Sequence, residues 1–253
     1  MPPARLSVVI PAYNEQARLP ESLGTAALWL GRQGGPVEIL VVDDGSHDGT
    51  AAVAEEFAAR AREGPVAVRV LRNGRNRGKG YSIKHGVLEA RGEFLLISDA
   101  DFSTPIEELP RLFQPVEAGE CDLAIGSRGL PESRIEVRQP WWREAMGRTF
   151  NLILRRLTGL PYRDTQCGFK VMRRKPVLPL FRAARIERFA YDVEILYLAR
   201  KARLEVREIP VRWRDARGSK VHAARDSLRM LREVAEVLWR DRRSRYGRIG
   251  PVA

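Results

Sequence analysis

The stretch that decides the fold is Glu93-Phe94-Leu95-Leu96-Ile97-Ser98-Asp99-Ala100-Asp101. Its apolar run predicts a buried strand, and two carboxylates follow directly at the end of that strand. A buried carboxylate without a partner is strongly unfavourable, so we expect Asp99 and Asp101 to have a positively charged or hydrogen-bonding partner. Mg²⁺ or Mn²⁺ takes hard oxygen ligands and keeps positions open for phosphate oxygens. The alternative is a plain turn, with Asp101 in water and Asp99 capping an amide.

Short apolar runs and helix-period stretches alternate on both sides of this strand. We expect strands at residues 6–10, 38–42, 66–71, 93–98 and 122–125. This alternation predicts an α/β fold with a mostly parallel central sheet and helices on both faces. Ligands bind such sheets at the carboxyl ends of the strands, so the turns there are the first place to look for chemistry.

Two other strand ends carry residues suited to a nucleotide. The first expected strand runs into Pro11-Ala12-Tyr13-Asn14-Glu15, and the second runs into Asp43-Asp44-Gly45-Ser46. A tyrosine ring can pack on a base or ribose, and a carboxylate can accept a hydrogen bond from either. Together with Asp99 and Asp101, these turns predict a nucleotide-diphosphate pocket. Taken singly, Tyr13 and Asp43 fit ordinary turn chemistry equally well.

A basic, glycine-rich loop at residues 73–80 leads into an expected helix. Its spacing matches neither the P-loop pattern G-x-x-x-x-G-K-[ST] nor the dinucleotide pattern G-x-G-x-x-G. The sequence therefore excludes a P-loop and a dinucleotide-binding loop of these types. The loop amides and Lys79 remain candidates to face an anion or a nucleobase.

Composition excludes several classes of protein. The chain has 253 residues, of which 44% are hydrophobic and 30% charged, and this suits one or at most two globular domains. No apolar run approaches the roughly 20 residues that span a bilayer, and no signal peptide opens the sequence. Cys121 and Cys167 belong to no metal-binding or redox motif. We therefore expect reduced thiols and a cytoplasmic location.

The charge of +12 is unevenly distributed. Residues 1–126 hold 13 Lys and Arg against 18 Asp and Glu, whereas residues 127–253 hold 31 against 14. The basic half predicts an anionic partner such as nucleic acid, an anionic membrane surface or a phosphorylated substrate. A solvated basic surface without a partner is the alternative.

The second half also contains two basic amphipathic helices. They are expected at residues 141–157 and 223–240, where Trp141, Trp142 and Trp239 suit a membrane interface. Simple packing of both helices onto the sheet explains the same pattern. We divide the chain into a domain at residues 1–222, with halves 1–126 and 127–222, and a basic C-terminal helix and tail at residues 223–253.

Several motifs give the chain a family resemblance. Residues 8–15, 41–50 and 99–101 resemble the family 2 glycosyltransferases of the GT-A fold. In the second half, the motifs resemble the branch of that family that includes the dolichyl-phosphate β-glucosyltransferases and their bacterial relatives. The second-half motifs are Gly126-Ser127-Arg128, residues 164–170, residues 187–194 and Gly218-Ser219-Lys220. The resemblance covers roughly residues 5–235.

The resemblance implies an enzyme that transfers a hexose with inversion. The donor would be a nucleotide sugar, most simply UDP-glucose, and the acceptor a polyprenyl phosphate of the dolichyl or undecaprenyl type. The protein would work as a peripheral protein on the inner, cytoplasmic face of the cell membrane. Alternatives are another donor such as GDP-mannose, a soluble or glycan acceptor, and, remotely, a nucleic-acid-binding module. The last leaves the acidic turns unused, and no nucleic-acid-binding motif is present, so we expect no nucleic acid partner.

The resemblance also assigns roles to individual residues. The nucleotide-sugar residues are Pro11, Ala12, Tyr13, Glu15, Asp43, Lys79, Asp99, Ala100 and Asp101. Asp99 and Asp101 would hold Mg²⁺ or Mn²⁺ on the diphosphate, and Arg128 and Arg148 would take the acceptor phosphate. The expected catalytic residues are Asp101, Arg128 and Asp164.

Two features depart from the family pattern. Eukaryotic relatives carry an N-terminal membrane anchor, whereas this sequence starts a few residues before its first expected strand. Ser103 stands where many lipid-phosphate sugar transferases have Gln, so no third metal contact is expected there.

Overall fold

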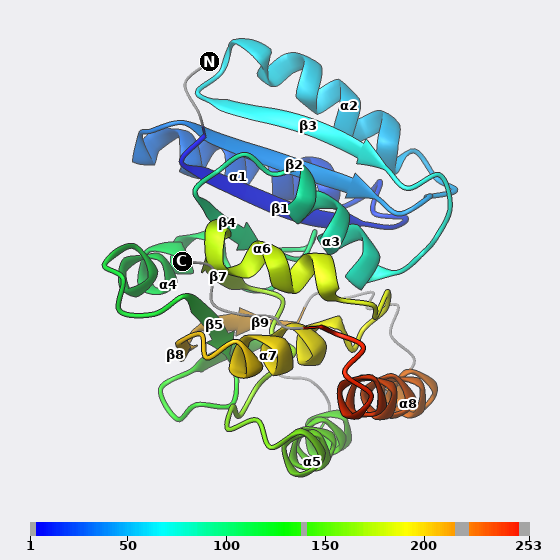
Figure 1. Ribbon diagram of the computed structural model, residues 1–253. Helices are drawn as coiled ribbons and strands as arrows, with labels where there is room; N and C mark the ends of the chain where they lie inside the picture. Colours follow the sequence, from blue (N-terminus) through cyan, green and yellow to red (C-terminus); the bar gives the residue numbers. More distant parts are fainter. Residues whose placement is uncertain (1–3, 138–140, 216–222, 248–253) are drawn as a thin grey trace.

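A seven-stranded mixed sheet forms the centre of the molecule (Figure 1). The computed structural model describes residues 4–137, 141–215 and 223–247. Strand order in the sheet is β3-β2-β1-β4-β7-β5-β8, and β6 pairs with β9 in a separate ribbon. The strands are β1 (Leu6–Ala12), β2 (Val37–Asp43), β3 (Val66–Arg72), β4 (Phe94–Ile97), β5 (Leu123–Ser127), β6 (Arg134–Val137), β7 (Lys170–Arg173), β8 (Val206–Pro210) and β9 (Arg212–Arg214). All five strands expected in the first half are confirmed.

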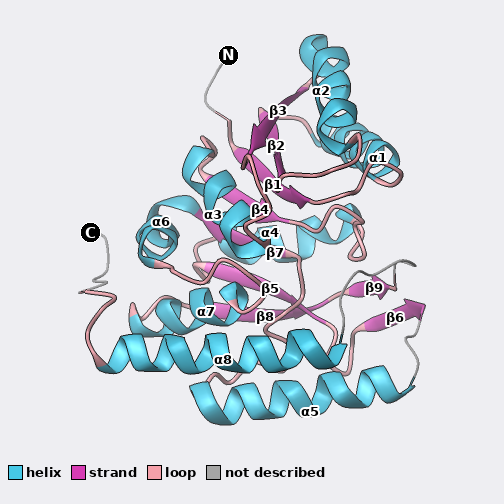
Figure 2. Cartoon of the chain, turned by 90° about the vertical axis from the view of Figure 1, so that its right-hand side faces the viewer, coloured by secondary structure: helices cyan, strands magenta, loops and turns pink. Residues whose placement is uncertain are grey.

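Helices cover both faces of the sheet (Figure 2). The helices are α1 (Leu19–Gln33), α2 (Thr50–Arg60), α3 (Lys79–Glu89), α4 (Leu109–Glu117), α5 (Trp141–Thr158), α6 (Arg174–Ala183), α7 (Tyr191–Lys201) and α8 (Ala223–Arg242), with short 3₁₀ turns at Ala61–Glu63 and Ile106–Glu108. One apolar core joins α1, α2 and α4 to the sheet, and a second joins α3, α6, α7, α5 and α8 to its other face.

The central strands are apolar on both sides because each side faces a helical layer. Val8 and Ile10 of β1 belong to one core, whereas Val9 between them belongs to the other. Successive side chains of a strand point to opposite faces, so a strand buried on both faces reads as a continuous apolar run. The α/β fold class expected from the sequence is confirmed.

The strand β7 is antiparallel to both of its neighbours. It lies between β4 and β5, and β5 runs parallel to β8. As a result, the end of β4, the start of β7 and the end of β5 all lie at one edge of the sheet. Residues that follow β4 and β5 therefore meet residues that precede β7, although they are far apart in the sequence.

The segment after α7 forms two strands, β8 and β9. β8 ends at Pro210, and the chain then leaves the sheet to form β9 with β6. Proline has no amide hydrogen to donate and is found on edge strands, which is where β8 lies. The partner strand β6 lies in the segment between β5 and α5.

The two basic helices of the second half lie side by side. α5 and α8 are in contact along one side of the molecule (Figure 2). Phe150 and Leu154 of α5 and Met230, Val234 and Val237 of α8 are buried in the core that also holds α3 and α7. No described helix is long and apolar enough to cross a membrane.

Two glycines in helices give opposite stability predictions. A Cβ on Gly86 of α3 would lie 2.4 Å from Val9 Cγ1, whereas one on Gly24 of α1 meets nothing within 4 Å. We expect Gly86→Ala to lower the free energy of unfolding by about 1–3 kcal/mol through overpacking. We expect Gly24→Ala to raise it by about 1 kcal/mol through helix propensity. Denaturant unfolding checks both, and equal effects in the two variants would contradict the packing described.

Candidate functional site

The centre of the site is an ion pair at the tip of β4. Lys79, the first residue of α3, places its Nζ 2.5 Å from Oδ1 of Asp99. Burial by itself would raise the pKa of Asp99, but the Lys79 ammonium outweighs this and lowers that pKa below its usual value. Burial likewise opposes the charge on Lys79, yet Asp99, Asp192 and Asp101 together raise its pKa. Both groups are therefore charged at neutral pH.

The Asp99 carboxylate is packed against the backbone of Gly168. A Cβ on Gly168 would lie 2.1 Å from Asp99 Oδ2, so the carboxylate would have to move if this residue had a side chain. Gly168 comes shortly before β7, which starts at the sheet edge where β4 ends. Glycine lets the Asp99 carboxylate keep its position beside Lys79, so Gly168 is a positioning residue that the sequence pattern did not single out.

Asp101 is held in a different way. Its Oδ1 accepts a hydrogen bond from the Ser103 amide at 3.0 Å, and Phe102 between them has a φ of 43° and is buried. The side chain lines a cavity of about 600 Å³ together with Arg18 and Arg214. Asp99 thus contacts Lys79, while Asp101 faces this cavity. The assignment of both to one metal stays a prediction.

The turns after β1 and β2 lie next to the tip of β4. Ala12 is paired with Asp43 in the parallel register, and the Asp44 amide donates to the Ala12 carbonyl at 2.8 Å. Asp43 accepts from the Ser46 amide at 3.3 Å. The Tyr13 ring lies edge-on to His47, with centroids 6.3 Å apart. These three turns meet at one sheet edge, as their positions in the sequence predicted.

The remaining residues that were predicted to bind the nucleotide sugar also lie at this edge of the sheet. Glu15 forms an ion pair with Arg18, with 2.7 Å between the closest atoms. Pro11 lies in β1, and Ala100 is buried between the two aspartates. Their contact with a nucleotide stays a prediction.

Asp44 is a residue that the sequence pattern did not single out. Its carboxylate accepts from Asn73 Nδ2 at 2.8 Å and from the amides of Arg77 and Gly78 at 3.0 and 2.7 Å. Asp44 therefore fixes the glycine-rich loop that ends in Lys79. In the run Asp43-Asp44-Gly45-Ser46, no sequence signal separates the carboxylate that faces a ligand from the one that organises the loop.

Arg128 and Asp164 form a two-pronged ion pair at the same edge. Arg128 Nε lies 2.7 Å from Asp164 Oδ2, Nη2 lies 3.0 Å from Oδ1, and the Arg128 amide donates to Oδ2 at 3.0 Å. Burial would raise the pKa of Asp164, but Arg128 outweighs it and lowers that pKa to about 2. The Arg128 side chain is 32% exposed, so the guanidinium that Asp164 holds in place is still open to solvent. Arg148 lies in α5, but its side chain is outside the described residues.

A buried ion pair lies behind Asp99 and was also missed. Lys170 Nζ is 2.5 Å from Asp192 Oδ1 and donates to the Cys167 carbonyl, and the pair is almost completely buried. Acidic residues are common in the first turn of a helix, where they interact with the helix dipole. The sequence therefore gave no sign that Asp192 forms a buried ion pair.

The fold and the site together define a glycosyltransferase of the GT-A type. The profile of the family described as Glycosyl transferase family 2 matches residues 7–181. The chain belongs to this family, and the resemblance noted from the sequence is confirmed.

Curated relatives match over most of the chain. A dolichyl-phosphate β-glucosyltransferase from Drosophila melanogaster is 37% identical over 92% of this chain and 74% of its own length. The proteins of the same name from Dictyostelium discoideum and Homo sapiens are each 34% identical, over 93% and 87% of this chain and 74% and 70% of their own lengths.

Solved structures confirm the fold. One is glucosyl-3-phosphoglycerate synthase from Mycobacterium tuberculosis, in complex with Mn²⁺, uridine-diphosphate-glucose and glycerol 3-phosphate. It has a TM-score of 0.67 at 21% identity, over 97% of this chain and 81% of its own. Mannosyl-3-phosphoglycerate synthase from Rubrobacter xylanophilus has a TM-score of 0.66 at 20% identity, over 95% and 74%.

The oxygen atoms at the tip of β4 suit a divalent cation whose other ligands come from a bound substrate. Among the described residues, no group of three or more His, Cys, Asp or Glu side chains could hold a metal. Asp99 and Asp101 supply hard carboxylate oxygens, and Mg²⁺ or Mn²⁺ commonly binds through one or two carboxylates plus phosphate oxygens. The residues present suit a cation brought in with a diphosphate better than one caged by the protein.

The ion pair of Asp164 predicts a dependence of stability on acid. The folded pKa of about 2 lies below the usual 3.8, so the stabilisation is complete above pH 4 and is lost as the pH falls through 2. Between pH 5 and 2, wild type should lose about 2 kcal/mol of unfolding free energy relative to Asp164→Asn, which has no such proton. Urea unfolding at each pH measures this. Parallel pH profiles of the two proteins would contradict the assignment.

The contact between Gly168 and Asp99 gives a second prediction. Gly168→Ala should push Asp99 away from Lys79, and the pKa of Asp99 should then rise. A ¹³C NMR titration of the aspartate carboxyls follows it. The control is Gly147→Ala on α5, where an added Cβ meets nothing within 4 Å. An unchanged Asp99 titration in Gly168→Ala would show that the contact does not position the carboxylate.

Proposed function

We propose that this enzyme transfers glucose from UDP-glucose to a polyprenyl phosphate, with inversion, at the cytoplasmic face of a membrane. The observation that carries the proposal is the meeting of Asp99, Lys79 and Arg128 at one sheet edge. This arrangement supplies a carboxylate for a cation and two positive groups for phosphates. The names of the curated relatives support a glucosyl donor and a dolichyl-phosphate acceptor.

The turns after β1 and β2 would hold the nucleoside. Tyr13 offers a ring face, and Asp43 offers a carboxylate to a base or ribose hydroxyl. Asp99 and Asp101 would hold Mg²⁺ or Mn²⁺ on the diphosphate, and this cation would stabilise the negative charge that develops on the departing nucleotide. The ammonium of Lys79, held by Asp99, lies where it can take up part of the same charge.

The acceptor half of the reaction needs positioning more than proton removal. A lipid phosphate oxygen is already an anion at neutral pH, so it attacks without a strong general base. Arg128 presents its guanidinium in a fixed plane because Asp164 binds two of its nitrogens. A guanidinium suits bidentate recognition of a phosphate. We assign Asp164 a positioning role through Arg128, and Arg148 a second contact to the phosphate.

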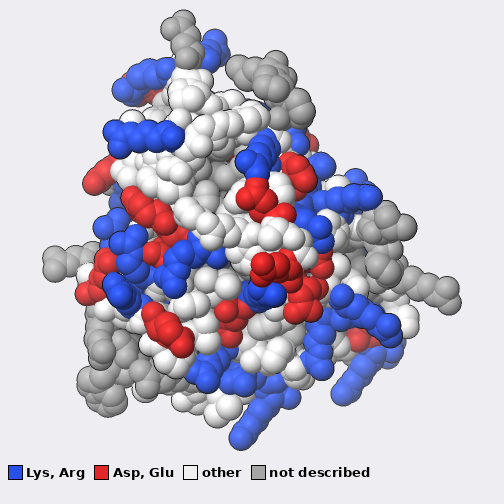
Figure 3. Space-filling view, turned by 90° about the vertical axis from the view of Figure 1, so that its left-hand side faces the viewer, with Lys and Arg blue, Asp and Glu red and all other residues white. Residues whose placement is uncertain are grey.

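The outer faces of α5 and α8 would lie against the membrane. Leu152, Ile153 and Leu157 of α5 and Leu228 and Trp239 of α8 are exposed apolar side chains. Arg243 and Arg245 lie over the Trp239 ring, at 4.9 and 4.5 Å from its centroid. Apolar residues among arginines suit the interface of an anionic bilayer. Lys and Arg side chains also project from the lower edge of the face drawn in Figure 3.

A transfer assay tests the proposal. The protein is incubated with labelled UDP-glucose, Mn²⁺ and a short polyprenyl phosphate, and the products are extracted into organic solvent. Label in the organic phase is expected. Label that stays wholly in water with intact enzyme would reject the lipid acceptor, and a panel of UDP- and GDP-sugars identifies the donor. A soluble acceptor is the alternative, since the two synthases of similar fold are named for 3-phosphoglycerate.

Two variants separate the donor role from the acceptor role. Asp101→Ala should lower turnover by at least about 100-fold, because charge on the leaving group is no longer compensated. Arg128→Lys keeps a cation beside Asp164 but lacks the fork, so it should raise the acceptor KM about tenfold with the donor KM unchanged. The exposed Glu132→Ala is the control. Wild-type turnover in Asp101→Ala, or a changed donor KM alone in Arg128→Lys, would contradict these roles.

A further inference from the structure

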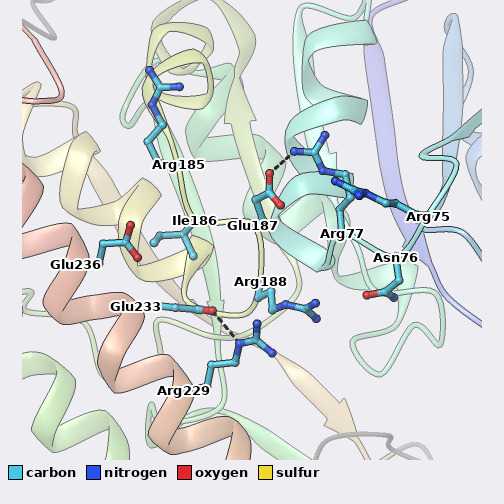
Figure 4. Close-up of a pocket in the computed structure, with 10 residues that line it drawn as sticks. All are labelled: Arg75, Asn76, Arg77, Arg185, Ile186, Glu187, Arg188, Arg229, Glu233 and Glu236. Atoms are coloured by element: carbon cyan, nitrogen blue, oxygen red, sulfur yellow. Dashed lines mark hydrogen bonds and ion pairs between the residues drawn. The ribbon is translucent and has the colours of Figure 1, made fainter.

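A second cavity lies apart from Asp99 and Lys79 and shares no lining residue with that pair. It has a volume of about 410 Å³ and lies between the loop after β3, the segment before α7, and α8 (Figure 4). Five arginines and three glutamates line it, with Asn76 and Ile186. The proposed reaction uses none of these side chains.

Every carboxylate of this cavity already has a cation as its partner. The pairs are Glu187 with Arg77, Glu233 with Arg229 at 3.5 Å, and Glu236 with Arg240 at 2.5 Å. Glu233 also accepts a hydrogen bond from the Ala190 amide at 3.2 Å. Each glutamate therefore has another cation as its closest partner, and Glu233 attracts Arg188 only at longer range.

Three arginines of the lining lack an ion pair within the described part of the chain. Arg75, Arg185 and Arg188 form no ion pair with any residue that the structure describes. In Figure 4, Arg188 points into the space between Arg229 and the loop that carries Arg75, whereas Arg185 points away. Nε of Arg77 is buried and has no hydrogen-bond partner among the residues that the structure describes. Positive groups gathered in this way attract an anion.

We propose that this cavity binds a phosphate group, chiefly through Arg75 and Arg188. Guanidinium forks match the oxygens of a phosphate and bind it with charge-assisted hydrogen bonds. Two sources share this chemistry, namely free phosphate and the headgroup of an anionic lipid. The lipid source is within reach because Arg229 and the exposed Leu228 are neighbours on α8.

A phosphate here would act on the site through the segment at residues 185–190. The carbonyls of Glu187 and Ile186 lie so close to Gly78 and Gly80 that a Cβ on either glycine would come within 2.5 and 2.7 Å of them. Lys79 lies between these two glycines. A ligand that joins Arg188 to Arg75 would therefore brace the segment against the turn that holds Lys79.

Calorimetric titration of the full chain with inorganic phosphate, at constant ionic strength maintained with chloride, tests the proposal. We expect saturable binding to wild type that weakens about tenfold or more in Arg188→Ala and in Arg75→Ala. The control is Arg32→Ala, which removes an exposed arginine at the end of α1 and should bind phosphate as wild type does. Circular dichroism confirms that each variant is folded.

Sedimentation with phosphatidylglycerol vesicles, against phosphatidylcholine vesicles, then identifies the source. Binding to the anionic vesicles that phosphate competes away, and that Arg188→Ala loses, supports a lipid headgroup. Phosphate binding that depends on Arg188, with vesicle binding that does not, supports free phosphate. If Arg188→Ala and Arg75→Ala bind phosphate and vesicles as well as Arg32→Ala does, the proposal is wrong. Loss of phosphate binding in Lys79→Ala, with Arg188→Ala and Arg75→Ala unchanged, would place the ion at the strand tip and also overturn the proposal.

Discussion

The ion pair between Lys79 and Asp99 is the interaction on which the rest of the site depends. The sheet brings Asp99 to the tip of β4, Gly168 leaves room for its carboxylate, and Asp44 fixes the loop that delivers Lys79. A charge pair that is partly withdrawn from water is stable only when both members are held in place. Its surroundings therefore serve one requirement, which is to keep a negative and a positive group together at the edge where ligands bind.

The fold was predictable because local and global signals agree in the first half of the chain. Continuous apolar runs such as Leu6–Ala12 are typical of strands buried on both faces, and the acidic turns follow from strand direction. The sequence could not show that β7 runs antiparallel, because the pattern of a strand carries no direction. The contact between Gly168 and Asp99 depends on that direction, and this explains why the glycine was missed.

Residues of the site could be predicted where their type and their position at a strand end suggest one role. Charged residues that pair with each other in the interior were harder to predict. Asp99, Asp43 and Arg128 were singled out from the sequence, and all three lie at one edge of the sheet, while their roles stay predictions. Lys170 and Asp192 neutralise each other in the interior, and a sequence shows two charges without showing that they meet. The partner of Arg128 was missed for the same reason, although Asp164 itself was singled out. Pairing at long sequence separation is a property of the fold, not of a motif.

In the proposed reaction, the carboxylate of Asp99, which pairs with Lys79, also binds Mg²⁺ or Mn²⁺. Electron paramagnetic resonance of Mn²⁺, titrated into wild type and Lys79→Met without nucleotide, tests this most directly. Lys79→Met should bind Mn²⁺ more tightly, because the ammonium no longer competes for Asp99, and adding Asp99→Asn should abolish the gain. Equal Mn²⁺ affinity in wild type and Lys79→Met would show that Lys79 and the cation do not compete for Asp99.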